Sequence, residues 1–271
     1  MSAAPSPPAD LERALARKVG RAIRDYRMIE EGDRILVAVS GGKDSYTLLD
    51  LLERLRRRSP VRFDLVACTV DQGYAGFRAD LIEEHLRAGG YRYHIETTGI
   101  AGTIRRKMDP GDTLCSLCAR LRRGALYRLA DELGCGKIAL GHHADDLIET
   151  LLMLQFFNGQ IKAMPPVLRA ENGRHTVLRP MIYVWEQEVS EYARRRRFPV
   201  VCCCCSACGD DSLQRRQIKS FLKRLEAGHP GIKASLLKAT RNIHLPYLMD
   251  PRFLPGAGKG GGPGETRRNR P

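Results

Sequence analysis

The chain has 271 residues, which favours one or two domains and is ample for a sizeable hydrophobic core. Hydrophobic residues make up 43% and charged residues 28%, and 45 Lys and Arg against 31 Asp and Glu leave a net charge of +14, so a disordered or fibrous chain is excluded. Since no run reaches the roughly 18 apolar residues of a membrane helix and the N-terminus lacks a secretory pattern, we expect a cytoplasmic protein with no membrane partner.

Short apolar segments alternate with amphipathic ones along most of the chain. In chain order the pattern predicts a disordered tail at 1–10, a helix at 11–26, a strand at 34–39, a helix at 44–55, a strand at 63–70, a helix at 81–86, a strand at 91–95, a helix at 114–133, a strand at 137–140, a helix at 144–157, a strand at 175–182 and a helix at 185–197. Strands alternating with helices predict an α/β fold with a doubly wound, mostly parallel, Rossmann-like sheet.

The last part of the chain differs in character from this alternating domain, which we place at 11–210. Helical patterns at 212–226 and 233–241 predict a C-terminal helical extension over 211–250. Residues 251–271 are rich in Gly and Pro and carry Arg267, Arg268 and Arg270, so we expect a disordered basic tail.

Nine cysteines are spread unevenly through the chain. Cys68 and Cys135 stand in or beside apolar runs and are expected in the core, whereas the others form a CxxC at 115–118 and a crowded cluster at 202–208. Basic residues gather in runs at 54–58, 105–107, 120–123 and 194–197, three of which flank the cysteine clusters. The charge favours a polyanionic partner such as a nucleic acid, although a basic run is often only a solvated face.

The hexapeptide SGGKDS at 40–45 follows a predicted strand and begins a predicted helix. Gly41 and Gly42 allow backbone N–H groups to approach an anion, and the helix N-terminus adds partial positive charge. The spacing is not that of a Walker A loop. Lys43 either contacts phosphate or caps the loop, and Asp44 either helps to hold Mg²⁺ or occupies a first helical turn, where an acid is favourable.

Two further strand ends fall at the same expected edge of the sheet. Asp71 and Gln72 follow the second strand and either face a nucleotide or form a turn. The segment GHHADD at 141–146 follows the fourth strand, and its paired acids either bind Mg²⁺ and relay a proton or cap the next helix, with Asp145 the candidate in both cases. His142 is interpreted as a structural hydrogen-bonding residue.

The CxxC at 115–118 lies at a helix start among basic residues, which lowers thiol pKa values and favours metal-binding thiolates. A second CxxC is formed by Cys205 and Cys208. Two such pairs suit a structural zinc site, and thiolates suit an iron–sulfur cluster equally well.

SGGKDS resembles the PP-loop of the N-type ATP pyrophosphatases, and the order SGGKDS, CSLCARLRRG, GHHADD, LRP, CSACG and LQRR over roughly 11–250 resembles the tRNA 2-thiocytidine synthetases. The resemblance implies ATP-dependent 2-thiolation of cytidine 32 in the anticodon loop of tRNA, with base adenylation followed by sulfur transfer. Related uridine-54 thiolases carry terminal CxxC pairs that this chain does not have, which favours cytidine. The implied ATP-binding residues are Ser40, Gly41, Gly42, Lys43, Asp44, Ser45, Asp71 and Gly141.

In that family three cysteines hold a [4Fe–4S] cluster whose fourth iron is open. Carried over to this chain, Cys115 and Cys118 are two ligands, and the third is Cys208 or Cys205, since four consecutive cysteines at 202–205 depart from the family pattern. The implied catalytic residues are Asp145, Asp44 and Arg122. Arg122 would steady developing phosphate charge or belong to a solvated helix face.

The implied cofactors are the cluster and Mg²⁺, with ATP as cosubstrate. The implied partners are tRNA and a sulfur donor such as a cysteine desulfurase, and a homodimer is possible. The alternatives are another PP-loop enzyme, such as a 2-thiouridine, lysidine-forming or amide-forming synthetase, and a non-catalytic, zinc-stabilised nucleic-acid-binding module.

Overall fold

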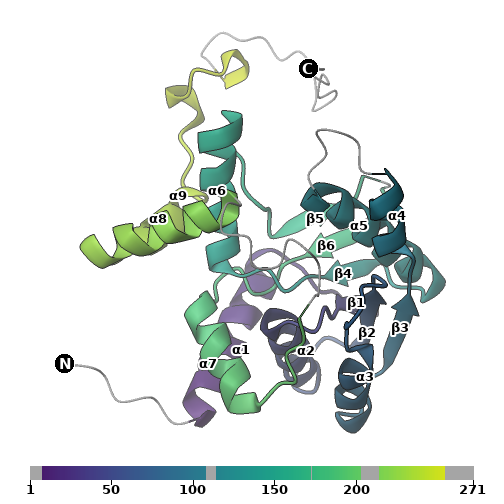
Figure 1. Ribbon diagram of the computed structural model, residues 1–271. Helices are drawn as coiled ribbons and strands as arrows, with labels where there is room; N and C mark the ends of the chain where they lie inside the picture. The colour runs from purple at the N-terminus through teal and green to yellow at the C-terminus, as the bar shows by residue number, and fades with distance from the viewer. Residues whose placement is uncertain (1–7, 108–113, 172, 203–213, 254–271) are drawn as a thin grey trace.

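The computed structural model describes residues 8–107, 114–171, 173–202 and 214–253 (Figure 1). Its centre is a six-stranded sheet in the order β3-β2-β1-β4-β6-β5. The strands are β1 (Asp33–Ala38), β2 (Phe63–Asp71), β3 (Tyr93–Thr97), β4 (Lys137–Ala139), β5 (Val167–Arg169) and β6 (Thr176–Leu178). All neighbours pair in parallel except β5, which is antiparallel to β6 at the edge. The predicted doubly wound, mostly parallel α/β fold is confirmed.

Helices cover both faces of this sheet (Figure 1). They are α1 (Pro8–Asp25), α2 (Lys43–Arg56), α3 (Ala79–Ala88), α4 (Ile100–Lys107), α5 (Leu114–Glu132), α6 (Ala144–Asn158), α7 (Glu186–Arg196), α8 (Gln214–Gly228) and α9 (Ile232–Ala239), with 3₁₀ turns η1 (Leu245–Tyr247) and η2 (Pro251–Phe253). On β1, Ile35 and Val37 pack in the cluster shared with α1, α2, α3 and α7, whereas Leu36 packs against α5. Alternate residues of a strand point to opposite faces, so one apolar strand serves both layers.

The C-terminal helices pack against α6 rather than standing apart from the domain. Ile218 and Leu222 of α8 are buried together with Ile148 and Leu152 of α6, and Figure 1 shows α8 and α9 beside α6, which runs away from the sheet. Leu237 of α9 also contacts the main core. The C-terminal extension therefore shares its apolar interior with the sheet domain.

Several elements differ from their predicted limits. Helix α1 begins at Pro8, so residues 8–10 form its first turn instead of tail, because proline is tolerated in a first turn. Residues 251–253 likewise form η2 instead of tail. Strand β6 ends at Leu178 well before the predicted limit of 182, since Pro180 has no N–H to donate.

Helix α4 and strand β5 were not predicted. The sequence of α4, IAGTIRRK, is short and contains a glycine and a threonine, which are weak helix formers. Strand β5 has three residues and lies at the edge, where a short strand gives little alternation in sequence. Within the described ranges, the helices are all too short or too polar to span a bilayer.

Substituting Leu222 tests the packing of the extension. Leu222 is 1% exposed, so Leu222→Ala is expected to lower the free energy of unfolding by about 2–4 kcal/mol while urea unfolding remains a single transition. The neighbouring Lys223 is exposed, and Lys223→Ala should change this energy by less than about 0.5 kcal/mol. An unchanged main transition in Leu222→Ala would mean that α8 is not part of the cooperative unit.

Candidate functional site

The candidate site lies at the carboxyl-terminal edge of the sheet, where the segments after β1, β2, β4 and β6 meet. Gly141, after β4, approaches the start of α2 so closely that a Cβ atom there would lie 3.1 Å from the Asp44 carbonyl oxygen. Met181, after β6, forms a parallel bridge with His143. Parallel strands bring their carboxyl ends to one edge, so motifs distant in sequence converge here as predicted.

The SGGKDS loop is a compact turn closed by its own serines. The Ser45 hydroxyl donates to the Gly42 carbonyl at 2.8 Å, and the Ser40 amide donates to the Ser45 hydroxyl at 3.2 Å. Gly41 has φ +82°, which glycine adopts without strain. Helix α2 begins directly after Gly42, so the partial positive charge of a helix N-terminus lies in the loop.

Lys43 at the start of α2 is held by two carboxylates. Its ammonium lies 2.9 Å from Asp44 and 3.3 Å from Glu186, the first residue of α7. Burial opposes the charged form, but Asp44 and Glu186 outweigh it and raise the pKa of Lys43. Glu186 also pairs with Lys219 of α8 at 2.6 Å. Lys43 is therefore a fixed cation beside the loop.

The acidic pair at the start of α6 is engaged by other elements. One oxygen of Asp145 accepts from the Glu186 amide at 2.7 Å, and the other accepts from Lys233 of α9 at 2.8 Å. Asp145 is 4% exposed. Because it accepts from the first amide of α7, it caps α7 rather than its own helix. Asp146 accepts from the backbone N–H of His143 at 2.9 Å. A catalytic role for Asp145 remains a prediction.

The segment after β2 connects the sheet edge to the first cysteine motif. Asp71 accepts from the Gly73 amide at 2.8 Å, which is the turn alternative considered for this residue. The Cys118 thiol donates to the side-chain oxygen of Gln72 at 2.9 Å, and the Gln72 carbonyl accepts from the Ala101 amide. Cys118 on α5 therefore lies at the same edge as the SGGKDS loop.

The second cysteine segment begins against the loop. The Val201 amide donates to the Gly41 carbonyl at 3.0 Å, and a Cβ on Gly41 would lie 2.2 Å from Val201 Cγ2. Cys202 follows and is exposed. Cys205 and Cys208 lie outside the described residues, as does the side chain of Cys115.

The described cysteines separate into two kinds. Cys68 and Cys135 are buried as predicted, and burial raises the pKa of Cys68 to about 12 and that of Cys135 above its ordinary value. Inert core thiols of this kind do not suit metal binding. Cys118 is half-buried against the apolar cluster of Ile100, Ile104 and Leu117, with its thiol on Gln72. Its soft sulfur fits an iron–sulfur or zinc ligand. Among the side chains that the structure describes, no three His, Cys, Asp or Glu residues are arranged to hold a metal ion.

The predicted catalytic arginine is solvent-facing. Arg122 is exposed on α5, four residues beyond Cys118. This fits the alternative of a solvated helix face, and a contact with phosphate remains a prediction.

Several residues of the site were not predicted. The buried Arg179 of the LRP motif donates to the His142 imidazole at 3.3 Å and to the Pro165 carbonyl at 2.7 Å. Burial lowers the pKa of His142 to about 4, so the ring is neutral and accepts this bond, in agreement with its structural interpretation. The LRP and LQRR motifs were the sequence signal for their arginines. Their order along the chain does not predict which residues those arginines contact in the fold.

Glu149 is the most perturbed carboxyl group beside the site. It is 5% exposed on α6, and Arg215 of the LQRR motif lies 3.4 Å away while also contacting Asp146 at 3.3 Å. Burial raises the pKa of Glu149 to about 7, although Arg215 opposes the shift.

Comparisons with a family profile and with individual relatives agree on the family of this chain. A family profile described as a PP-loop domain matches residues 11–222. The chain is 55% identical over 238 residues to a tRNA-cytidine(32) 2-sulfurtransferase of Geobacter sulfurreducens, covering 88% of this chain and 93% of the relative. It is 56% identical to the protein of that name from Geotalea uraniireducens, covering 88% and 94%.

Among solved structures, the chain is similar to the U34-tRNA thiolase NcsA from Methanococcus maripaludis, which was solved with its [4Fe–4S] cluster. The TM-score is 0.68 at 22% identity, and the match covers 87% of this chain and 79% of that one. At this identity the likeness establishes a shared fold.

The close contact at Gly41 predicts an unequal response to two glycine substitutions. Gly41 and Gly32 both have positive φ, +82° and +80°, but nothing lies within 4 Å of a Cβ on Gly32. Gly32→Ala should lower the free energy of unfolding by about 1–2 kcal/mol from backbone strain. Gly41→Ala should lose about 1–3 kcal/mol more from the clash with Val201. Equal losses in urea unfolding would contradict the described contact.

Glu149 predicts a pH-dependent stability difference. Because its pKa is about 7 when folded and near 4.5 when unfolded, the folded chain binds more protons between these values, and this carboxyl group destabilises the fold increasingly as pH rises. Glu149→Gln should match the native protein below pH 4.5 and exceed its free energy of unfolding above pH 7, by on the order of 1–3 kcal/mol. A difference that stays constant from pH 4 to 8 would contradict this environment.

Proposed function

Because the chain belongs to the tRNA-cytidine(32) 2-sulfurtransferase family of PP-loop enzymes, we propose that it uses ATP to replace O2 of cytidine 32 in tRNA with sulfur. One observation carries the proposal. The phosphate loop at 40–45, the Cys118 thiol and the start of the second cysteine segment lie at one edge of the sheet. A base that must be activated by ATP and then meet sulfur needs both centres within reach of one position.

The first proposed step is adenylation of the base. The loop residues Ser40, Gly41, Gly42 and Ser45 bind the phosphates of ATP, since backbone donors at a helix N-terminus favour anions. The cytidine O2 attacks the α-phosphorus and the bond to pyrophosphate breaks, leaving an O2-adenylated base. Lys43 is held in its charged form by Asp44 and Glu186 and would stabilise the negative charge that develops on the departing pyrophosphate. Asp44, at the helix start, is proposed to hold Mg²⁺, for which a carboxylate oxygen is a suitable ligand.

The second proposed step is displacement of AMP at C2 by sulfur. A [4Fe–4S] cluster held by Cys115, Cys118 and either Cys208 or Cys205 would, when bound, supply the site at which sulfur is presented to the base. Before a cluster binds, the Cys118 thiol donates to Gln72 and is thereby held at the edge of the sheet, and this proton would be lost when the thiolate binds iron. The sulfur itself comes from a donor such as a cysteine desulfurase, and AMP leaves with the former O2.

The remaining predicted residues have defined proposed roles. Asp145 ties the starts of α6 and α7 to α9 and is proposed to keep Glu186, and through it Lys43, in place. Gly141 permits the close approach of its segment to Asp44. Asp71 shapes the turn before Gln72, and Arg122 is proposed to meet tRNA phosphate from the exposed side of α5. A homodimer remains a prediction.

The proposal predicts a selective effect of cysteine substitution. Cys118→Ser keeps a donor for Gln72 but removes the sulfur ligand, so tRNA from cells lacking this gene and complemented with Cys118→Ser should contain no 2-thiocytidine by nucleoside mass spectrometry. Cys135→Ala removes a thiol that is buried in the core cluster with Leu36 and Leu129 and should restore 2-thiocytidine fully. Anaerobically purified native protein should be brown and contain iron, and the Cys118→Ser protein should have lost most of that iron.

Retention of 2-thiocytidine in cells lacking the gene would overturn the proposed function, and loss of 2-thiouridine instead would redirect it to another base. Colourless native protein with stoichiometric zinc would support the zinc-stabilised module instead.

A further inference from the structure

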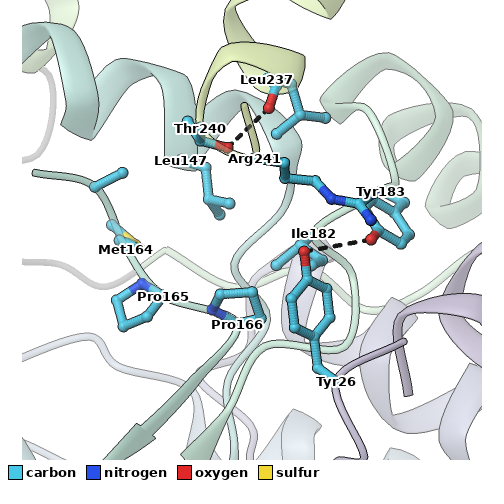
Figure 2. A pocket seen from close by; sticks show the side chains of 11 residues that line it. Tyr26, Leu147, Met164, Pro165, Pro166, Ile182, Tyr183, Leu237, Thr240 and Arg241 are labelled. Atoms are coloured by element: carbon cyan, nitrogen blue, oxygen red, sulfur yellow. Dashed lines mark hydrogen bonds between the residues drawn. The ribbon is translucent and has the colours of Figure 1, made fainter. Parts of the chain in front are cut away.

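A cavity of about 460 Å³ opens between α1, α6 and α9, separate from the phosphate loop (Figure 2). Its volume falls in the range of small-ligand pockets, about 300–1,000 Å³. Leu147, Ile182 and Leu237 form apolar walls, and Tyr26, Tyr183 and Arg241 provide rings, hydroxyls and a guanidinium. We infer that this pocket binds one unstacked nucleotide of the RNA substrate, outside the position where the reacting cytidine binds. The inference rests on the proposed function in that RNA is the substrate.

The aromatic part of the pocket is held in place before any ligand arrives. The Tyr183 hydroxyl donates to Asp25 at 3.0 Å, and the Tyr26 hydroxyl lies 3.4 Å from the Tyr183 hydroxyl. The two rings are 6.3 Å apart between centroids and tilted by 44°. Tyr183 is 6% exposed and supports the half-buried Tyr26 ring, which is the face on which a single-stranded base can stack.

Two arginines, Arg21 of α1 and Arg241 in the turn after α9, lie against the Tyr183 ring. The Arg21 guanidinium carbon lies 4.3 Å from the ring centroid and that of Arg241 lies 5.4 Å away, and Figure 2 shows the Arg241 side chain directed at this ring. Planar guanidinium groups stack on bases and bind phosphate through paired donors. Arg241 is exposed and can serve both purposes at the mouth of the pocket. The Thr240 hydroxyl donates to the Leu237 carbonyl, which leaves its oxygen lone pairs to accept from a base.

The pocket is built on the same structural elements, α6, α9 and the segment after β6, that form the reaction site. Leu147, on its wall, lies one helical turn beyond His143 on α6, and Ile182 follows Met181, which bridges to His143. Lys233 of α9 binds Asp145 at the start of α6, and the last turn of α9 brings Leu237, followed by Thr240, to the pocket wall. A loop nucleotide bound here would therefore hold the RNA while a neighbouring base occupies the site.

RNA fits this pocket better than an acidic peptide does. The chain carries +14, so a polyanion is attracted in either case. The half-buried Tyr26 ring and the rings of Pro165 and Pro166 offer flat apolar faces suited to a base, and a carboxylate side chain has no flat apolar face to match them. Binding of an acidic peptide with affinity equal to that of RNA would reject the assignment.

The test uses the full-length holoenzyme and a synthetic, unmodified anticodon stem-loop RNA that contains cytidine 32, with 2-aminopurine placed at each loop position in turn. Binding is measured without ATP. Arg241→Ala and Tyr26→Ala should each weaken the Kd by about tenfold or more, because a stacked base and its phosphate contact are lost. Arg224→Ala removes the same charge from an exposed position on α8 outside the pocket and should change the Kd by less than about threefold.

Conservative variants separate stacking from fold damage. Tyr26→Phe keeps the ring and should bind within about twofold of the native protein, whereas Arg241→Lys keeps the charge and should recover part of the loss. A 2-aminopurine at a loop position other than 32 should change its fluorescence on binding to the native protein, since its base exchanges the loop stack for the pocket, and this change should vanish in Tyr26→Ala.

Native Kd values in both pocket variants, or losses equal to that of Arg224→Ala, would overturn the inference. Filling of the pocket by the chain's own C-terminal tail, seen as tighter RNA binding after residues 254–271 are removed with no response to Arg241→Ala, would overturn it as well. The proposed function is judged separately, by thiolation of full tRNA. RNA that binds through the pocket but is never thiolated contradicts only the function, and thiolation with a pocket that does not affect Kd contradicts only this inference.

Discussion

The architecture of the site depends on one close contact, between the Gly41 carbonyl of the phosphate loop and the Val201 amide at 3.0 Å. The approach requires an absent side chain, because a Cβ at Gly41 would lie 2.2 Å from Val201 Cγ2 and the backbone there has φ +82°. Glycine thus serves two purposes at one position, freeing the loop to turn and letting a distant segment pack on it. That segment continues into Cys202, so one backbone interaction holds the start of the second cysteine cluster against the loop.

Ion pairs hold the start of α6, which lies opposite the phosphate loop in the site. Asp145, Asp146 and Glu149 cluster at the start of α6, and Lys233 and Arg215 reach them from the C-terminal helices. Buried carboxylates of this kind are costly without cationic partners. The C-terminal helices therefore contribute more than apolar packing, since they also stabilise the acidic turn that faces the phosphate loop. The raised pKa of Glu149 marks the place where neutralisation is incomplete.

The sequence predicted those parts of the fold whose signals lie within one short segment of the chain. The strand, glycine turn and helix at 34–55 carry their own signals in apolar run, loop residues and helical spacing, and the alternation of such units implies a parallel sheet. The short helix α4 and the three-residue strand β5 have no such local signal, because tertiary packing rather than propensity defines them. Contacts between distant segments were equally hidden. Lys233 and Asp145 are 88 residues apart, and no spacing rule links them.

The proposed reaction requires that the phosphate loop and the cysteine site open into one cavity that a single base can span. It is tested most directly by a crystal structure of the iron-containing holoenzyme with a non-hydrolysable ATP analogue. We expect the α-phosphate over residues 40–45 and the cluster on Cys115 and Cys118, both lining one continuous cavity. A cluster separated from the nucleotide by packed side chains, or lying on the opposite face of the sheet, would contradict this expectation.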